Sequence, residues 1–130
     1  MVSVKTFFGG FYMTIGEISK KTGLPESTLR YYERKGLILV TRDRSGRRAY
    51  LESDVEWVKF ICRLKETGMP LRDIQRYAEL RYAGDATMCE RLDMLRLHRA
   101  YVLEQQRKWG GYLQNLDDKI QFYQQSINKQ

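Results

Sequence analysis

Cysteine, histidine and proline are scarce in this chain, which has two cysteines, one histidine and two prolines among 130 residues. Two cysteines are too few for a disulfide scaffold, and they fit a protein of the reducing cytoplasm. A zinc-type site needs three or four convergent ligands, whereas Cys62, Cys89 and His98 stand apart in the sequence. We therefore expect no bound metal. No apolar run is long enough to cross a bilayer, so we expect no membrane partner.

Signatures of catalysis and of export are also missing. The sequence contains no nucleophile–base pair, no paired carboxylates and no glycine-rich loop that would cradle a phosphate. We therefore expect neither an enzyme nor a bound cofactor. The opening residues 1–12 carry a single charge and lack the layout of a signal peptide, so we expect a loose N-terminal extension there.

Positive charge is what the sequence has in excess. Lysine and arginine number 23 against 16 acids, which gives a formal net charge of +7. Nine of these cations, against four acids, fall between Thr14 and Tyr50. A basic segment of this kind suits a polyanionic partner such as double-stranded DNA.

A helix-turn-helix pattern occupies the same segment. Thr14 is followed three residues later by Glu17, which is the capping-box arrangement of a helix start. Gly23 ends this helix, and Pro25 marks the next start. The second helix carries hydroxyl, phenol and guanidinium groups that can reach phosphates and base edges, or that simply make a solvated surface helix. These groups belong to Ser27, Thr28, Arg30, Tyr31, Tyr32 and Arg34.

Residues 37–51 predict a small hairpin wing. Two strand-like stretches, 38–40 and 49–51, flank a polar turn that contains Gly46. The arginines of this turn are suited to gripping phosphates beside a groove, although a solvated charged loop is the alternative. They are Arg42, Arg44, Arg47 and Arg48.

Three more helices are predicted after the wing. Two of them, one capped by Ser53 and one that begins near Pro70, complete a small core and close a DNA-binding domain at 13–85. The third, within 86–130, shows a heptad seam that must be buried against a partner, most economically a second copy of the chain. Gly110-Gly111 in this helix either permits a close helix crossing or bends the rod. The predicted dimerisation residues are Leu92, Leu95, Val102, Trp109, Leu113, Leu116, Ile120 and Tyr123.

The order of these elements resembles the MerR family of bacterial transcription regulators, from about Met13 to Leu80. The resemblance implies a mainly α fold, with a winged helix-turn-helix domain followed by a long dimerisation helix that forms an antiparallel coiled coil. It also implies a homodimer on a pseudo-palindromic promoter operator, with control by distortion of the DNA and contact with RNA polymerase. The matching stretches are 14–18, 29–38, 48–50, 54–61 and 64–74.

The resemblance also assigns roles to single residues. Arg30, Tyr31 and Tyr32 match helix contacts to backbone and bases, and Arg48 and Tyr50 match the wing arginine and tyrosine of the family. For Tyr32, the spacing with a buried-type leucine leaves a packing role equally open. The predicted set of DNA-binding residues also includes Thr14.

Two cysteines are the candidates for an effector site. Metal-responsive relatives have cysteines flanking the dimer helix and a cysteine-bearing loop beyond it, whereas here Cys89 stands alone near the helix start. Some short relatives answer aldehydes or oxidants through one cysteine in the third helix, and Cys62 lies in that helix. Nearby cations such as Arg63 would favour a reactive thiolate if they surround it, but an inert core cysteine is the alternative.

Two other readings compete with a promoter regulator. An excisionase-like or architectural DNA-binding protein can share the winged domain, but such proteins usually lack a long dimer rod. A protein-interaction coiled coil with an incidental basic head would show no sequence-specific binding. The regular seam favours the regulator.

Overall fold

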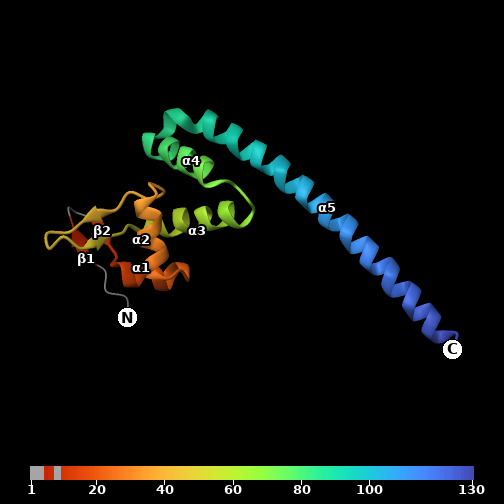
Figure 1. Ribbon diagram of the computed structural model, residues 1–130. Helices are drawn as coiled ribbons and strands as arrows, with labels where there is room; N and C mark the ends of the chain where they lie inside the picture. Colours follow the sequence, from red (N-terminus) through yellow and green to blue (C-terminus); the bar gives the residue numbers. More distant parts are fainter. Residues whose placement is uncertain (1–4, 8–9) are drawn as a thin grey trace. The chain divides into compact units, whose positions relative to one another are not determined.

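The computed structural model describes residues 5–7 and 10–130, and it separates into two compact units, Met1–Arg91 and Leu92–Gln130. Figure 1 shows the order of the elements along the chain. Among the described residues, no helix combines the length and apolarity that a bilayer crossing requires. The elements are β1 (Lys5–Phe7), β2 (Gly10–Tyr12), α1 (Ile15–Thr22), α2 (Glu26–Arg34), β3 (Thr41–Arg42), β4 (Arg48–Ala49), α3 (Glu52–Glu66), α4 (Leu71–Ala83), η1 (Asp85–Thr87) and α5 (Met88–Asn128).

The helix-turn-helix follows the predicted caps. Thr14 Oγ1 accepts the Glu17 N–H at 3.2 Å, and the Glu17 carboxylate accepts the Thr14 N–H at 3.3 Å, which completes the capping box of α1. Gly23 ends the helix with φ of 76°, a left-handed conformation that glycine adopts without strain. The second helix, α2, then begins directly after Pro25. A mainly α fold with a helix-turn-helix, a wing and a long final helix is confirmed.

The N-terminal stretch differs from the prediction of a loose extension over residues 1–12. Strands β1 and β2 pair antiparallel, with Lys5 opposite Tyr12. Four of the six residues in these strands are aromatic or β-branched, and such residues favour extended backbone. Residues 1–4 and 8–9, also within the predicted extension, lie outside the described part of the chain.

The wing is shorter than predicted and lies later in the chain. Strands β3 and β4 pair Thr41 with Ala49, whereas strands were expected over 38–40 and 49–51. Ile38 is buried in the core rather than paired in a sheet, so burial of its side chain overrides its strand propensity. The turn between the strands is closed by Asp43, whose carboxylate accepts the N–H groups of Ser45 and Arg47 at 2.9 and 3.0 Å.

The core of the first unit gathers around α3, which contacts both α1 and α4. Trp57 lies at its centre, where its indole N–H donates to the Leu37 carbonyl at 3.0 Å and its ring stacks on Tyr77 at 5.8 Å. Helix α3 begins at Glu52 rather than being capped by Ser53, because the Asp54 carboxylate accepts the Leu51 N–H at 2.8 Å. Burial raises the pKa of Asp54 above its ordinary value.

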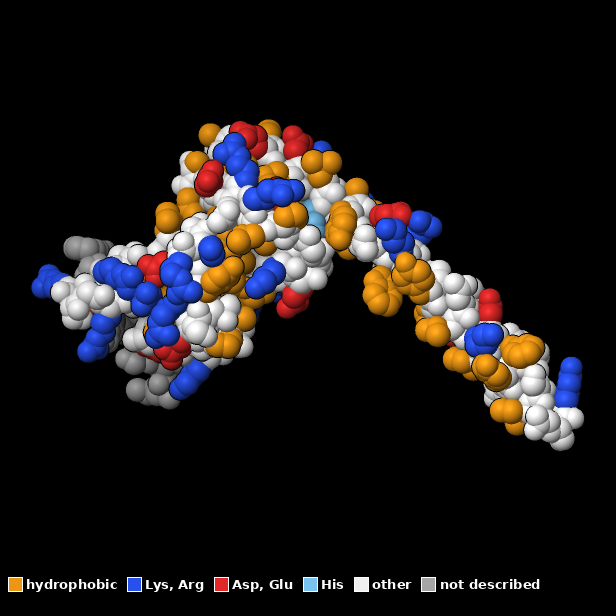
Figure 2. Space-filling view, in the orientation of Figure 1, with side chains coloured by type: hydrophobic (Ala, Val, Ile, Leu, Met, Phe, Trp, Pro, Cys, Tyr) orange, Lys and Arg blue, Asp and Glu red, His pale blue; other side chains and the backbone are white. Residues whose placement is uncertain are grey.

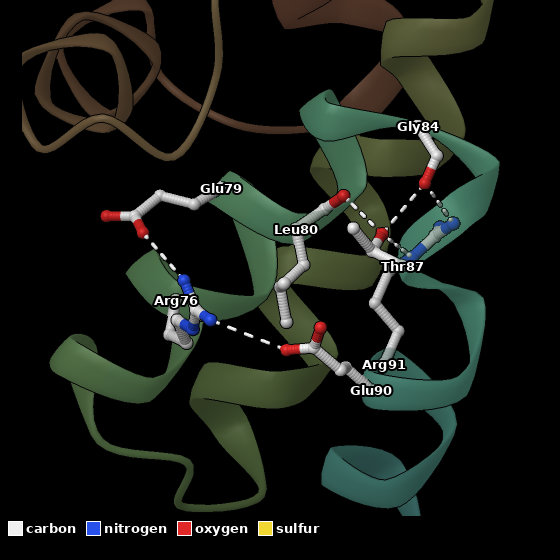
Figure 3. A network of polar contacts seen from close by, with 7 residues as sticks. All are labelled: Arg76, Glu79, Leu80, Gly84, Thr87, Glu90 and Arg91. Carbon is white, nitrogen blue, oxygen red and sulfur yellow. Dashed lines mark hydrogen bonds and ion pairs between the residues drawn. The ribbon is translucent and has the colours of Figure 1, made fainter.

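Polar contacts fix the first turn of α5 to the end of α4 (Figure 3). Thr87 Oγ1 donates to the carbonyls of Leu80 and Gly84, and the Arg91 guanidinium donates to Thr87 Oγ1 and to the Gly84 carbonyl. Arg76 pairs with Glu79 at 3.3 Å and with Glu90 at 3.4 Å. The first compact unit runs to Arg91, and the limit of the DNA-binding domain at Asp85 stays a prediction.

Helix α5 continues without interruption through Gly110 and Gly111 over its 41 residues, a length of about 60 Å. A Cβ at either glycine would meet no atom within 4 Å among the described residues, so nothing in this chain requires glycine there. Apolar side chains recur along the helix (Figure 2). The large ones that are exposed include Leu92, Trp109, Leu113, Leu116, Ile120, Tyr123 and Ile127.

Candidate nucleic-acid interface

Helix α2 presents a mixed polar face to solvent. Ser27 and Arg34 are exposed, and Thr28, Arg30 and Tyr31 are half-buried. Arg30 pairs with Glu26 one turn earlier at 3.3 Å, a solvent-exposed contact that is easily exchanged for a phosphate. Leu29 lies on the opposite face of the helix and is fully buried. The helix is therefore held by its apolar side while its hydroxyl, phenol and guanidinium groups remain accessible.

The wing carries four arginines, and Glu33 of α2 pairs with two of them. The Glu33 carboxylate accepts hydrogen bonds from Arg42 Nη2 at 3.0 Å and from Arg48 Nε at 2.6 Å. Arg44 and Arg47 are exposed and, within the described part of the chain, form no ion pair. Figure 2 shows lysine and arginine side chains gathered over the wing and α2. A cationic surface of this kind suits the phosphate backbone of a duplex.

Two of the tyrosines predicted to contact DNA lie in the core instead. Tyr32 is 2% exposed and its hydroxyl lies 3.4 Å from Cys62 Sγ, while Tyr50 is 0% exposed. Burial raises the pKa of Tyr32 well above its ordinary value, and it raises that of Tyr50 to about 12. Both tyrosines therefore pack in the core of this structure, and a DNA contact from Tyr32 or Tyr50 stays an untested prediction.

Thr14, which was also predicted to contact DNA, has a structural role. Its hydroxyl is engaged in the capping box of α1, and the residue is half-buried. The capping role is shown by these hydrogen bonds, whereas a phosphate contact from Thr14 stays a prediction.

Sequence reasoning missed the organising role of Glu33 and two lysines near Tyr31. The ammonium groups of Lys35 and Lys65 lie 5.7 and 5.8 Å from the centre of the Tyr31 ring. The i, i+4 spacing of Tyr31 and Lys35 on α2 was a usable signal. Lys65 comes from α3, so no local pattern could have placed it there.

The two cysteines lie in different surroundings. Cys62 is half-buried against the Tyr32 hydroxyl, whereas Cys89 is exposed in the first turn of α5. The described residues contain no group of three or more histidine, cysteine or carboxylate side chains that could hold a metal ion. Neither cysteine therefore has convergent ligands around it in the described structure.

Comparisons with known proteins agree with this geometry. The family described as MerR HTH family regulatory protein matches residues 13–80, and a second, described as MerR, DNA binding, matches residues 55–121. An uncharacterized HTH-type transcriptional regulator of Haemophilus influenzae is 37% identical over 114 residues, which cover 87% of this chain and 84% of that protein. The regulator AdhR of Bacillus subtilis is 39% identical over 71% of this chain and 66% of its own length.

Solved structures show the same likeness. HiNmlR, a MerR family regulator lacking the sensor domain and bound to promoter DNA, has a TM-score of 0.78 and 36% identity over 88% of this chain and 91% of that one. A putative MerR family regulator from Listeria monocytogenes has a TM-score of 0.81 and 31% identity over 85% of each chain. From these matches and from the winged helix-turn-helix itself, the chain belongs to the MerR family of helix-turn-helix regulatory proteins.

Proposed function

We propose that this protein is a cytoplasmic transcription regulator that binds a pseudo-palindromic promoter operator as a homodimer. The observation that carries the proposal is the accessible face of α2, with Tyr31 and Arg34, together with the exposed wing arginines Arg44 and Arg47. A relative with 36% identity was solved on promoter DNA, which supports the same partner here. Neither this surface nor the relatives point to an enzyme.

Each element of the surface has a distinct task in this proposal. Helix α2 enters the major groove, where Arg30, Tyr31 and Arg34 reach base edges and phosphates. The wing arginines contact the backbone beside the groove, and Glu33 holds Arg48 toward α2 until a phosphate competes for it. Bending and untwisting of the promoter would then control transcription by a neighbouring RNA polymerase.

A second copy of the chain is the proposed cover for α5. Apolar side chains of its heptad seam are exposed along the helix in the single chain. An apolar stripe of this length is normally buried against a second helix. In an antiparallel pair the two-fold axis falls near the middle of α5, where Gly110 and Gly111 lie. Because both glycines face open space in the single chain, their lack of side chains would permit a close crossing of the two helices.

A gel-shift assay on the DNA upstream of the protein's own gene tests the function. Specific retention should survive near-physiological salt, because base contacts add to the salt-dependent phosphate term. If the protein retained the promoter and random DNA equally at that salt concentration, it would not be a sequence-specific regulator. Only non-specific binding by its basic surface would remain.

The wing arginine Arg48 gives a graded prediction. We expect Arg48→Ala to weaken binding about tenfold on the operator and on random DNA alike, and to lower the salt slope by about one, because one phosphate contact is lost. Fluorescence anisotropy at several salt concentrations measures both effects. Arg76→Ala removes the same charge from α4, where Arg76 pairs with Glu79 and Glu90, and should change neither. Equal effects of the two variants would sink the assignment of Arg48.

The adjacent tyrosines of α2 should behave differently. Tyr31→Phe is expected to weaken operator binding about fivefold, roughly 1 kcal/mol, because one neutral hydrogen bond to DNA is lost. Tyr32→Phe removes a buried hydroxyl beside Cys62, so its effect should fall on stability and not on DNA affinity. Anisotropy and thermal unfolding of both variants separate the two roles. A loss of DNA affinity on Tyr32→Phe at unchanged stability would restore it as a contact.

A further inference from the structure

A pocket of about 250 Å³ lies among α2, α3 and α4 in the first unit. Its walls are mainly apolar, since most of them are buried side chains of the core. Preformed apolar pockets with one or two polar groups at the rim are the usual form of small-molecule sites. The lining residues are Tyr31, Tyr32, Leu37, Ile61, Lys65, Met69, Leu71 and Ile74.

Positive charge gathers around Tyr31, one of the residues that line this pocket. Lys65 belongs to the lining, and the cationic groups of Arg34, Lys35 and Lys65 all lie 5.7 to 5.8 Å from the centre of the Tyr31 ring. Within the described part of the chain none of these three cations forms an ion pair with a carboxylate. The contrast with the three arginines nearby is clear, because Arg30, Arg42 and Arg48 each pair with a glutamate.

We propose that this pocket binds a small apolar carboxylate, with its hydrocarbon body among the core side chains and its anionic end on Lys65. No lining residue is acidic, so no carboxylate of the wall competes for the ammonium group. At about 30 Å³, the liquid volume of one water molecule, for each water-sized group, the pocket of about 250 Å³ suits a ligand of about eight such groups. A ligand of this size binds with an affinity on the order of millimolar, which a charge-assisted hydrogen bond makes selective for anions.

Ligand binding would be coupled to DNA through Tyr31, and this second step rests on the proposed function. Tyr31 forms a wall of the pocket and also lies on the accessible face of α2. A bound carboxylate neutralises part of the positive charge around the Tyr31 ring. We therefore expect operator affinity to fall when the pocket is filled.

Benzoate is the probe for the first step, which needs no DNA. Titrated into the ¹⁵N-labelled full chain, it should bind saturably and shift resonances of α2, α3 and α4. Benzyl alcohol keeps the ring without the charge, and acetate keeps the charge without the ring, so both should bind at least fivefold more weakly. Acetate binding as tightly as benzoate would mean a surface ion contact only and would overturn the proposal.

Two variants of α3 locate the carboxylate. Lys65→Gln should weaken benzoate binding at least fivefold. Lys59→Gln, in which the lost ammonium lies 3.7 Å from a Glu56 carboxylate oxygen, should leave it unchanged. Unchanged binding by Lys65→Gln would also overturn the proposal. The proposal would also be overturned if benzoate bound only to a monomeric variant of the protein. The helix of a second copy would then be the natural occupant of the pocket.

The second step is measured on the operator. At saturating benzoate, operator affinity should fall at least threefold compared with the same concentration of sodium chloride, and the fall should vanish in Lys65→Gln. Operator binding that is insensitive to benzoate would refute the coupling while leaving the pocket intact. A chain that binds benzoate but no operator would instead refute the proposed function.

Discussion

Replacing Leu116 with lysine is expected to make the protein monomeric at micromolar concentration. Leu116 is 61% exposed in the single chain and falls on the heptad seam of α5. Burial of a leucine stabilises an interface by about 2 kcal/mol. In a two-fold dimer the substitution is present in both subunits, so the loss is doubled. The dimerisation constant should therefore fall about a thousandfold, by about 4 kcal/mol. Sedimentation equilibrium measures this directly.

Loss of the dimer should also be the largest effect on operator binding. Two linked heads gain about a hundredfold or more in affinity over one, without any new contact. Leu97→Lys makes the same change at a residue that is 75% exposed and lies off the seam, so it should stay dimeric and keep its affinity. A dimeric Leu116→Lys variant, or an equal loss in both variants, would show that α5 does not pair through this stripe.

Replacing Trp57 with alanine is expected to destabilise the first unit by about 3–5 kcal/mol. Trp57 is 4% exposed, and its removal leaves a large cavity and an unpaired carbonyl at Leu37, just after the end of α2. Because a domain of this size is stable by only about 5–15 kcal/mol, much of its stability would be lost. Urea unfolding followed by far-UV circular dichroism gives the change, and operator binding should be lost with the fold.

The second tryptophan provides the matched control. Trp109 is 70% exposed on α5, so Trp109→Ala should leave the unfolding of the first unit unchanged and weaken only the dimer. Trp57→Phe keeps a ring against Tyr77 but loses the hydrogen bond to Leu37, so an intermediate loss of about 1–2 kcal/mol is expected. If Trp57→Ala unfolds no more easily than Trp109→Ala, the packing described around α3 cannot be what stabilises the domain.

Local signals in the sequence predicted the elements better than they predicted the site. The capping box of Thr14 and Glu17 and the stop at Gly23 act within a few residues, and the structure confirms both. The wing strands were displaced because Ile38 is drawn into the core. Tyr32 and Tyr50 were assigned to DNA because tyrosines beside arginines suit a phosphate surface, but residue type alone does not say which side of a helix or strand is covered.

The amino-acid sequence by itself determined the helix-turn-helix, the charged wing and the seam of α5. Each of these depends on the spacing of residues close together in the chain, which helical and hairpin geometry convert directly into position. Tertiary structure alone decided that Glu33 joins α2 to the wing, that Tyr32 and Tyr50 are buried, and that Lys65 reaches Tyr31. These facts depend on packing between segments far apart in sequence, where no local period carries information.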